Sequence, residues 1–195
     1  MEKLFSSSID QGLFIGIFII WCLIILSERL VIKKHDNIQV KEKKDKGTYF
    51  LVYFTVLFSI SISFILSSEE ITRLPYLIFY IGIGFVIIGI LVREYSFYTL
   101  GSFFSFEIKV FEGHKLIDKG PYKFIRHPAY SGLVLSIIGI SLCVRSLIAV
   151  LIVMIMCFIA VGLRIKFEEN LLFIKFGQDF VNYKKKTKKV IPFIY

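Results

Sequence analysis

Five long apolar segments constrain this 195-residue chain more than any other feature. They cover residues 13–26, 49–66, 76–92, 130–144 and 147–163, with polar residues between them. A helix that crosses a hydrocarbon core of about 30 Å needs about 20 residues, and several of these segments reach or approach that length with their apolar flanks. The mean hydropathy of +0.73 is too high for an ordinary soluble domain. The sequence therefore predicts an all-α, polytopic membrane protein with five transmembrane helices.

The last two apolar segments are short and meet at Arg145 and Ser146, which predicts a helical hairpin. After Arg164, apolar residues recur between charged ones as far as Tyr183, and Gly177 interrupts the pattern. We predict two short amphipathic helices at the membrane surface in this part of the chain. Residues 1–195 are expected to form a single domain. Within it, residues 1–92 would supply scaffold helices and residues 93–195 would form the cofactor and catalytic region.

The distribution of charge predicts the orientation of the helices. The formal net charge is +9, and its excess lies in residues 33–46 and 184–189. In a membrane protein such lysines mark cytoplasmic loops near anionic lipid, so a nucleic-acid partner is not expected. An N-terminus outside and a C-terminus and polar region in the cytoplasm make every loop obey the positive-inside rule. The negative N-terminal flank also favours a retained first helix over a cleaved signal peptide.

Polar residues concentrate in residues 114–132, which contain two His, two Tyr, an Arg, two Pro and two Gly beside strongly apolar segments. Polar groups at a membrane boundary are costly unless they bind a ligand or line a wet cavity. A second polar cluster, which includes Arg164, Glu168 and Glu169, follows the last apolar segment. The two clusters together predict one site on the cytoplasmic side.

The residues of these clusters allow more than one interpretation. Arg164 and Glu168 are four residues apart, so they share a helix face as either a surface ion pair or an anion clamp beside a carboxylate. Pro128 suits the first turn of a helix, whose free N–H groups after His127 could receive an anion. Four aromatic residues are either interfacial anchors or faces for a bound cation: Tyr95, Tyr122, Phe124 and Tyr130.

The sequence predicts no metal site. The histidines lack the tight spacing of a motif such as HExxH. The three cysteines, Cys22, Cys143 and Cys157, lie inside apolar segments without metal-ligand spacing, and their odd number argues against a full set of disulfides. We expect them to be small core residues.

The order of these motifs resembles the isoprenylcysteine carboxyl methyltransferase (ICMT) family of integral membrane methyltransferases. The resemblance covers roughly residues 104–192 and rests on an ordered set: His114, Gly120, Tyr122, Arg126, His127, Pro128, Tyr130, Gly132, Arg164, Glu168, Glu169, Phe176, Gly177, Phe180, Tyr183, Ile191 and Pro192.

The resemblance implies S-adenosylmethionine as the methyl donor and a pocket that the C-terminal segment covers. It implies catalytic roles for Arg164, which would face the acceptor, and for Glu168, with Arg126 and Glu169 supporting them. The positions that it assigns to cofactor binding are Glu107, His114, Lys115, Leu116, Ile117, Tyr122, His127, Pro128, Ala129, Tyr130 and Glu168.

The expected function is methylation of a lipophilic acceptor that enters between helices, first of all carboxyl O-methylation of an S-isoprenylcysteine-like substrate. A carboxylate has a pKa of about 4 and needs no general base, whereas an amine, phenol or thiol would need Glu168 or His127 to remove a proton. Phospholipid N-methylation, or methylation of another lipid, a phenol or a thiol, is the alternative within enzymes. A small transporter or assembly factor is the non-enzymatic alternative, although the helices carry almost no charge at mid-membrane. The expected partners are the lipophilic substrate and membrane lipids.

Overall fold

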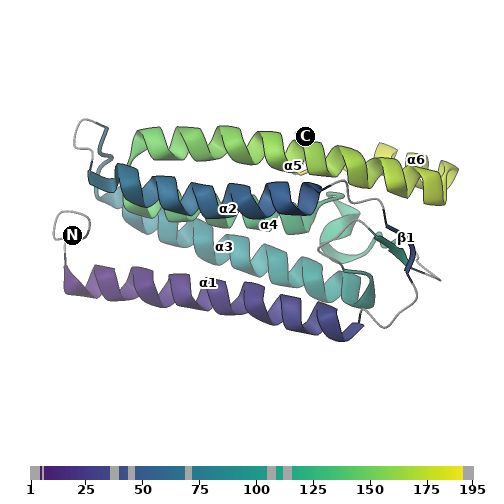
Figure 1. Cartoon of the computed structure of the whole chain (residues 1–195), viewed down its shortest axis with the longest axis horizontal. Helices are drawn as coiled ribbons and strands as arrows, with labels where there is room; N and C mark the ends of the chain where they lie inside the picture. Colours follow the sequence, from purple (N-terminus) through teal and green to yellow (C-terminus); the bar gives the residue numbers. More distant parts are fainter. Residues whose placement is uncertain are drawn as a thin grey trace.

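Long helices lie side by side along one axis of the molecule and form an elongated bundle (Figure 1). The computed structural model describes residues 5, 7–35, 40–43, 47–68, 72–104, 109–111 and 116–190. Its main helices are α1 (Ser8–His35), α2 (Thr48–Ile65), α3 (Leu77–Leu100), α4 (Pro128–Val144), α5 (Leu147–Phe176) and α6 (Gln178–Lys186). Single 3-10 turns, η1 (Leu66–Ser68), η2 (Gly101–Phe103) and η3 (Gly120–Lys123), extend the ends of helices or precede them. The predicted helical membrane fold is confirmed.

Four of the described helices are long and apolar enough to cross a membrane: α1, α2, α3 and α5. The fifth apolar helix, α4, has 17 residues. The predicted hairpin joins α4 to α5 through Arg145, which adopts a left-handed conformation with φ of 62°, and Ser146, whose side chain accepts a hydrogen bond from the Ala149 N–H. The protein is thus a multi-pass membrane protein with a short helix within its bundle.

Glycines set the closest contact in the bundle, between α3 and α4. A Cβ atom on Gly89 would lie 2.6 Å from the Gly132 carbonyl oxygen, and one on Gly82 would lie 2.7 Å from the Gly139 carbonyl oxygen. The reciprocal Cβ atoms would meet the partner backbone at the same distances. Small residues allow the backbones of membrane helices to approach closely. This contact holds the start of α4 against the C-terminal half of α3, which includes Arg93.

Polar contacts attach α1 to α3 at both of its ends. The Tyr80 hydroxyl donates to Asp10 Oδ1 over 3.1 Å, and Arg93 Nη2 lies 2.6 Å from Glu28 Oε2. The α1 helix packs mainly against α3, whereas α2 packs against α4 and α5. Two different sets of neighbours therefore hold α1 and α2.

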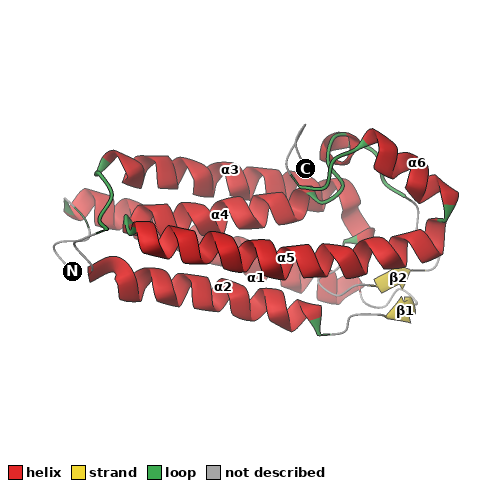
Figure 2. Ribbon diagram, turned by 90° about the horizontal axis from the view of Figure 1, so that it is seen from above, coloured by secondary structure: helices red, strands yellow, loops and turns green. Residues whose placement is uncertain are grey.

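The loops at one end of the bundle meet one another. The Leu74 N–H donates to the Arg145 carbonyl, and the Leu147 N–H donates to the Thr72 carbonyl. The α2–α3 connection and the α4–α5 turn thus lie on the same side, as the predicted topology requires. At the other end of the molecule lie α6 and a two-stranded ribbon (Figure 2).

Three details differ from the predictions. The segment after Arg164 is not a separate amphipathic helix, because α5 continues without a break to Phe176; the chain has no proline there, and Gly177, with φ of 52°, ends the helix. A short antiparallel ribbon pairs β1 (Val40–Lys43) with β2 (Lys109–Phe111), which the lysine-rich sequence did not indicate. Cys143 and Cys157 are buried as expected, whereas Cys22 is exposed.

Candidate functional site

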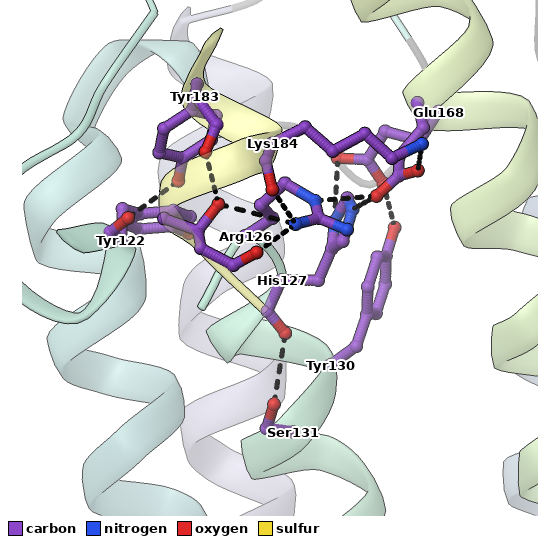
Figure 3. Close-up of polar contacts among 10 residues, drawn as sticks. Tyr122, Arg126, His127, Tyr130, Ser131, Glu168, Tyr183 and Lys184 are labelled. Carbon is purple, nitrogen blue, oxygen red and sulfur yellow. Dashed lines mark hydrogen bonds and ion pairs between the residues drawn. The ribbon is translucent and has the colours of Figure 1, made fainter. Parts of the chain in front are cut away.

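Three parts of the chain converge at the end of the bundle that carries α6. The η3 turn leads into Arg126 and His127, and α4 then begins with Pro128 at its first position, where a missing N–H costs nothing. The C-terminal half of α5 brings Arg164, Glu168 and Glu169 alongside. Figure 3 shows the side chains of this cluster pointing toward one another from η3, α4, α5 and α6.

A cavity of about 550 Å³ extends from this cluster into the bundle. Its volume is within the usual range of small-molecule sites, about 300–1,000 Å³. The polar end includes Arg126, His127, Tyr130, Arg164 and Glu168. Many of the other lining residues are apolar side chains of α1 and α2, among them Trp21, Ile25, Val52, Val56 and Ile60, and apolar residues of α4 and α5 such as Leu133 and Leu171 complete the lining. The site therefore joins a charged end to a long apolar end.

The Tyr130 hydroxyl connects the two residues predicted to be catalytic. Arg164 Nε donates to this oxygen over 2.6 Å, and the hydroxyl donates to Glu168 Oε2 over 2.8 Å. Arg164 Nη1 also donates to Thr48 Oγ1 over 3.2 Å, which ties the site to the first residue of α2. Arg164 is 3% exposed, whereas the Glu168 side chain is 31% exposed. The guanidinium is thus fixed, and the carboxylate of Glu168 remains accessible from the cavity.

Glu169, the residue next to Glu168, is surrounded by basic side chains. Its carboxylate oxygens lie 2.8 Å from Arg126 Nε and 3.1 Å from Lys184 Nζ. His127 Nε2 is 3.5 Å from Glu169 Oε1, too far for a good hydrogen bond, and no hydrogen-bond partner for it occurs in the described part of the chain. The two neighbouring glutamates therefore differ: Glu169 is held by Arg126 and Lys184, and Glu168 faces the cavity.

The segment after α6 lies along the η3–α4 connection. The N–H groups of Arg126 and His127 donate to the carbonyls of Lys188 and Lys189, and the Lys188 N–H donates back to the Phe124 carbonyl. The Arg126 guanidinium donates to the Thr187 carbonyl, and the Ser131 hydroxyl donates to the Val190 carbonyl over 2.6 Å. Residues 187–190 thus form one side of the polar cluster.

Two tyrosines complete the polar end. The Tyr183 hydroxyl donates to the Tyr122 carbonyl over 2.7 Å (Figure 3). Burial raises the pKa of both phenols above the ordinary value, so both hydroxyls stay protonated at neutral pH. Both residues line the cavity as neutral aromatic groups.

The structure brings most of the predicted site residues together. The residues that line the cavity are Leu116, Ile117, Tyr122, Arg126, His127, Ala129, Tyr130, Arg164 and Glu168. Pro128 is buried at the start of α4, and Glu169 supports Arg126. Glu107, His114 and Lys115 lie outside the described residues. Tyr95 and Phe124 are mostly exposed and are not among the residues that line the cavity.

Sequence reasoning did not identify Arg93 or the walls on α1 and α2. Arg93 lines the cavity, is 5% exposed, and donates both to Glu28 and, over 3.3 Å, to the Ala129 carbonyl. Its position near the end of an apolar segment was a usable signal, because an ionisable residue within a membrane helix usually has a functional partner. Hydropathy gives no comparable signal for which apolar faces line a cavity.

Comparison with known proteins agrees with this arrangement. The model of the isoprenylcysteine carboxyl methyltransferase (ICMT) family matches residues 82–174. A probable protein-S-isoprenylcysteine O-methyltransferase from Oryza sativa subsp. indica is 31% identical over 117 residues, which is 59% of this chain and 61% of the relative. Protein-S-isoprenylcysteine O-methyltransferase B from Arabidopsis thaliana is 30% identical over 115 residues, 58% of each chain. Residues 82–174 of the chain are therefore similar to the ICMT family.

The ICMT fold extends beyond the region of sequence similarity. The structure of a eukaryotic intramembrane Ras methyltransferase ICMT matches with a TM-score of 0.69 at 22% identity, over 98% of this chain and 70% of that one. The match therefore includes α1 and α2, which lie outside the residues matched by the family model. In sequence, the chain spans about 60% of the length of the curated ICMT relatives given above.

Proposed function

We propose that this chain methylates the carboxylate of an S-isoprenylcysteine-like acceptor with S-adenosylmethionine as the donor. The observation that carries the proposal is the single cavity that joins the charged cluster around Arg164 and Glu168 to an apolar space between α1 and α2. Such a cavity suits an acceptor with an anionic head and a hydrocarbon tail. The names of the curated relatives, protein-S-isoprenylcysteine O-methyltransferases, support the acceptor part of this proposal.

The residues present fit S-adenosylmethionine. When bound, this cofactor supplies an electrophilic methyl group on a positively charged sulfur. Glu168, accessible from the cavity, offers a carboxylate for a cation or for hydroxyl groups, and the faces of Tyr122 and Tyr130 suit a cation. His127 Nε2, buried and without a hydrogen bond among the described residues, is a polar atom available to a ligand. These groups, with Leu116 and Ile117, are the ones we assign to the cofactor; Glu107, His114, Lys115, Pro128 and Ala129 are assigned from the family resemblance.

Arg164 is assigned to the acceptor. A guanidinium presents paired N–H donors that match a carboxylate, and the bonds to Tyr130 and Thr48 fix its orientation. A carboxylate acceptor is already ionised at neutral pH, so no residue has to remove a proton. The contribution of the protein is then to hold the acceptor in line with the donor and to exclude water, which the buried position of Arg164 favours.

We place the N-terminus outside and the C-terminus and the charged end of the cavity in the cytoplasm. The lysines of residues 33–46 and 184–189 support this orientation through the positive-inside rule. The whole chain, residues 1–195, acts as one unit, in which α1 and α2 contribute the apolar walls and residues 93–190 contribute the charged end.

The proposal is tested with purified protein in lipid nanodiscs. Calorimetry should show saturable binding of S-adenosylhomocysteine, the demethylated product. Labelled S-adenosylmethionine and an S-farnesylcysteine analogue should give a product that releases labelled methanol in alkali, because a methyl ester hydrolyses there and N-methyl or S-methyl groups do not. Failure of well-folded protein to bind S-adenosylhomocysteine would contradict the proposal, and an alkali-stable product would indicate N- or S-methylation instead.

Two substitutions test the assignments. Glu168→Gln keeps the size of the side chain but removes its charge, so the affinity for S-adenosylmethionine should fall about tenfold or more, the usual scale for a hydrogen bond to a charged group. Arg164→Lys keeps the charge but loses the paired donors. It should leave S-adenosylhomocysteine affinity within about twofold and lower kcat/KM for the acceptor. Full activity of both variants would show that Glu168 does not bind the cofactor and that Arg164 does not bind the acceptor.

A further inference from the structure

The apolar half of the cavity has two walls that run in opposite directions along the bundle. On α1 the lining residues extend from Phe18 to Leu26, and on α2 they extend from Tyr49 to Ser61. The colours along the chain show that these two helices are antiparallel (Figure 1). Because α1 packs mainly on α3 while α2 packs on α4 and α5, the space between these two helices is left to the cavity.

A pair of phenylalanine rings bridges α1 and α2 one helical turn beyond the far end of the cavity. The rings of Phe14 on α1 and Phe64 on α2 meet edge to face, with centroids 6.0 Å apart. Phe14 lies one turn beyond Phe18, and Phe64 lies one turn beyond Ile60, so each ring follows directly after the last lining turn of its helix. Neither ring is among the residues that line the cavity.

On α1, neighbouring aromatic rings hold the Phe14 ring in place. Phe14 is 5% exposed, and its ring lies 5.6 Å from that of Phe5 and 6.1 Å from that of Phe18, measured between centroids. The Phe5 ring in turn meets Phe79, which is fully buried on α3. Phe64 is 40% exposed and is the less constrained member of the pair.

The opposite end of the same space is the charged cluster. Arg164 donates to Thr48 at the start of α2, and Phe64 lies near the end of that helix. Phe64 follows sixteen residues after Thr48, which corresponds to about 24 Å of helix at about 1.5 Å per residue. Along α2, the phenylalanine pair therefore lies at a fixed distance from the group assigned to the acceptor head.

We infer that the packed rings of Phe14 and Phe64, one turn beyond the last residues that line the cavity, act as the floor of the acceptor site and set the longest isoprenoid tail that the enzyme methylates efficiently. This inference rests on the proposed function, because it assumes that the tail lies between α1 and α2 with its carboxylate at Arg164. A tail that reaches the floor gains apolar contact along both helices. A longer tail would have to displace packed rings, and overpacking of a filled site is unfavourable.

The test compares S-geranyl, S-farnesyl and S-geranylgeranyl cysteine analogues as acceptors. Phe64→Ala opens the floor on its less constrained side, so the ratio of kcat/KM for the longest tail to that for the shorter ones should rise about tenfold or more. Phe58→Ala is the matched control: it removes the same side chain from α2 at a half-exposed, non-lining position before the last lining turn rather than beyond it, so the ratio should not change.

A second variant shifts the preference in the opposite direction. Ile60→Phe places a ring one turn closer to the charged end, so the preference should move toward the shortest tail by a similar factor. Folding of either variant is verified by an unchanged affinity for S-adenosylhomocysteine, because these positions lie far from the charged cluster.

Binding can also be followed without turnover, because Trp21 is the single tryptophan of the chain and lines the cavity. Acceptor analogues with brominated tails of graded length should quench its emission saturably, with an optimum length that Phe64→Ala extends. The inference that Phe14 and Phe64 limit the tail length would be overturned if Phe64→Ala and Ile60→Phe both left the length preference unchanged in turnover and in quenching. If the wild-type protein bound no S-adenosylhomocysteine but its Trp21 emission were still quenched in a length-dependent way, the limit on tail length would be supported and the proposed reaction would be rejected.

Discussion

At the scale of single residues, the hydroxyl of Tyr130 is the junction of the charged end. It accepts a hydrogen bond from Arg164 and donates one to Glu168, so it orients a cationic and an anionic group at the same time. The sequence placed these two charged residues on one face of a helix, but the spacing alone could not show that a tyrosine from α4 lies between them. The buried pair of Arg93 and Glu28 was equally hidden, because its members are far apart in the chain.

Tyr130→Phe should remove this junction and keep the ring. Hydrogen bonds to charged groups contribute about 1.5–3 kcal/mol, so we expect kcat/KM for the acceptor to fall about 10- to 100-fold. Tyr98→Phe is the control, since Tyr98 is 83% exposed and should be neutral. Equal methylation rates for Tyr130→Phe and the wild type would show that the hydroxyl does not orient the reacting groups.

At the scale of helices, the contact between α3 and α4 depends on residues without a side chain. A Cβ at position 89 would meet the Gly132 carbonyl oxygen at 2.6 Å, which forces the two backbones apart. Gly89→Ala should therefore destabilise the protein by about 1–3 kcal/mol, the usual scale for overpacking, and lower the unfolding temperature in detergent. Gly84→Ala in the same helix is the matched control, because a Cβ there meets nothing within 4 Å. If the two variants had equal thermal stability, the absence of a side chain at position 89 would not be needed for the packing of α3 against α4.

Hydropathy predicted the positions of the helices well, since apolar length is the dominant requirement of a membrane span. It could not predict that α5 continues to Phe176, because buried Glu169 alternates with exposed polar residues such as Lys166 and Asn170, and an amphipathic surface helix has the same pattern. The β1–β2 ribbon also escaped prediction: its strands are short, and their pairing joins residues far apart in the chain.

At the scale of the whole molecule, residues 187–190 complete the charged end. The carbonyls of Thr187, Lys188 and Lys189 receive hydrogen bonds from Arg126 and His127. Such a contact between distant segments is not visible in a sequence without the fold. Ending the chain after Lys186 should thus weaken S-adenosylhomocysteine binding at least tenfold, as measured by calorimetry, because it leaves these buried donors without acceptors.

The control for this truncation is the full-length double substitution of Lys185 and Lys186 by Gln. Both side chains are exposed, so removing their charges tests whether the basic character of the segment matters apart from its backbone. We expect unchanged binding. A truncated protein that binds S-adenosylhomocysteine as tightly as the full chain would show that the charged end forms without residues 187–190.

Because the cavity has apolar walls on α1 and α2, the affinity for a lipophilic acceptor depends on its concentration in the membrane. Both helices are long and apolar enough to cross a bilayer. If the proposed acceptor tail lies between them, it competes for this space with the neighbouring acyl chains. The fraction of cavities that hold an acceptor tail then depends on the mole fraction of acceptor in the membrane. Added detergent or lipid lowers this mole fraction, even when the total amount of acceptor is unchanged.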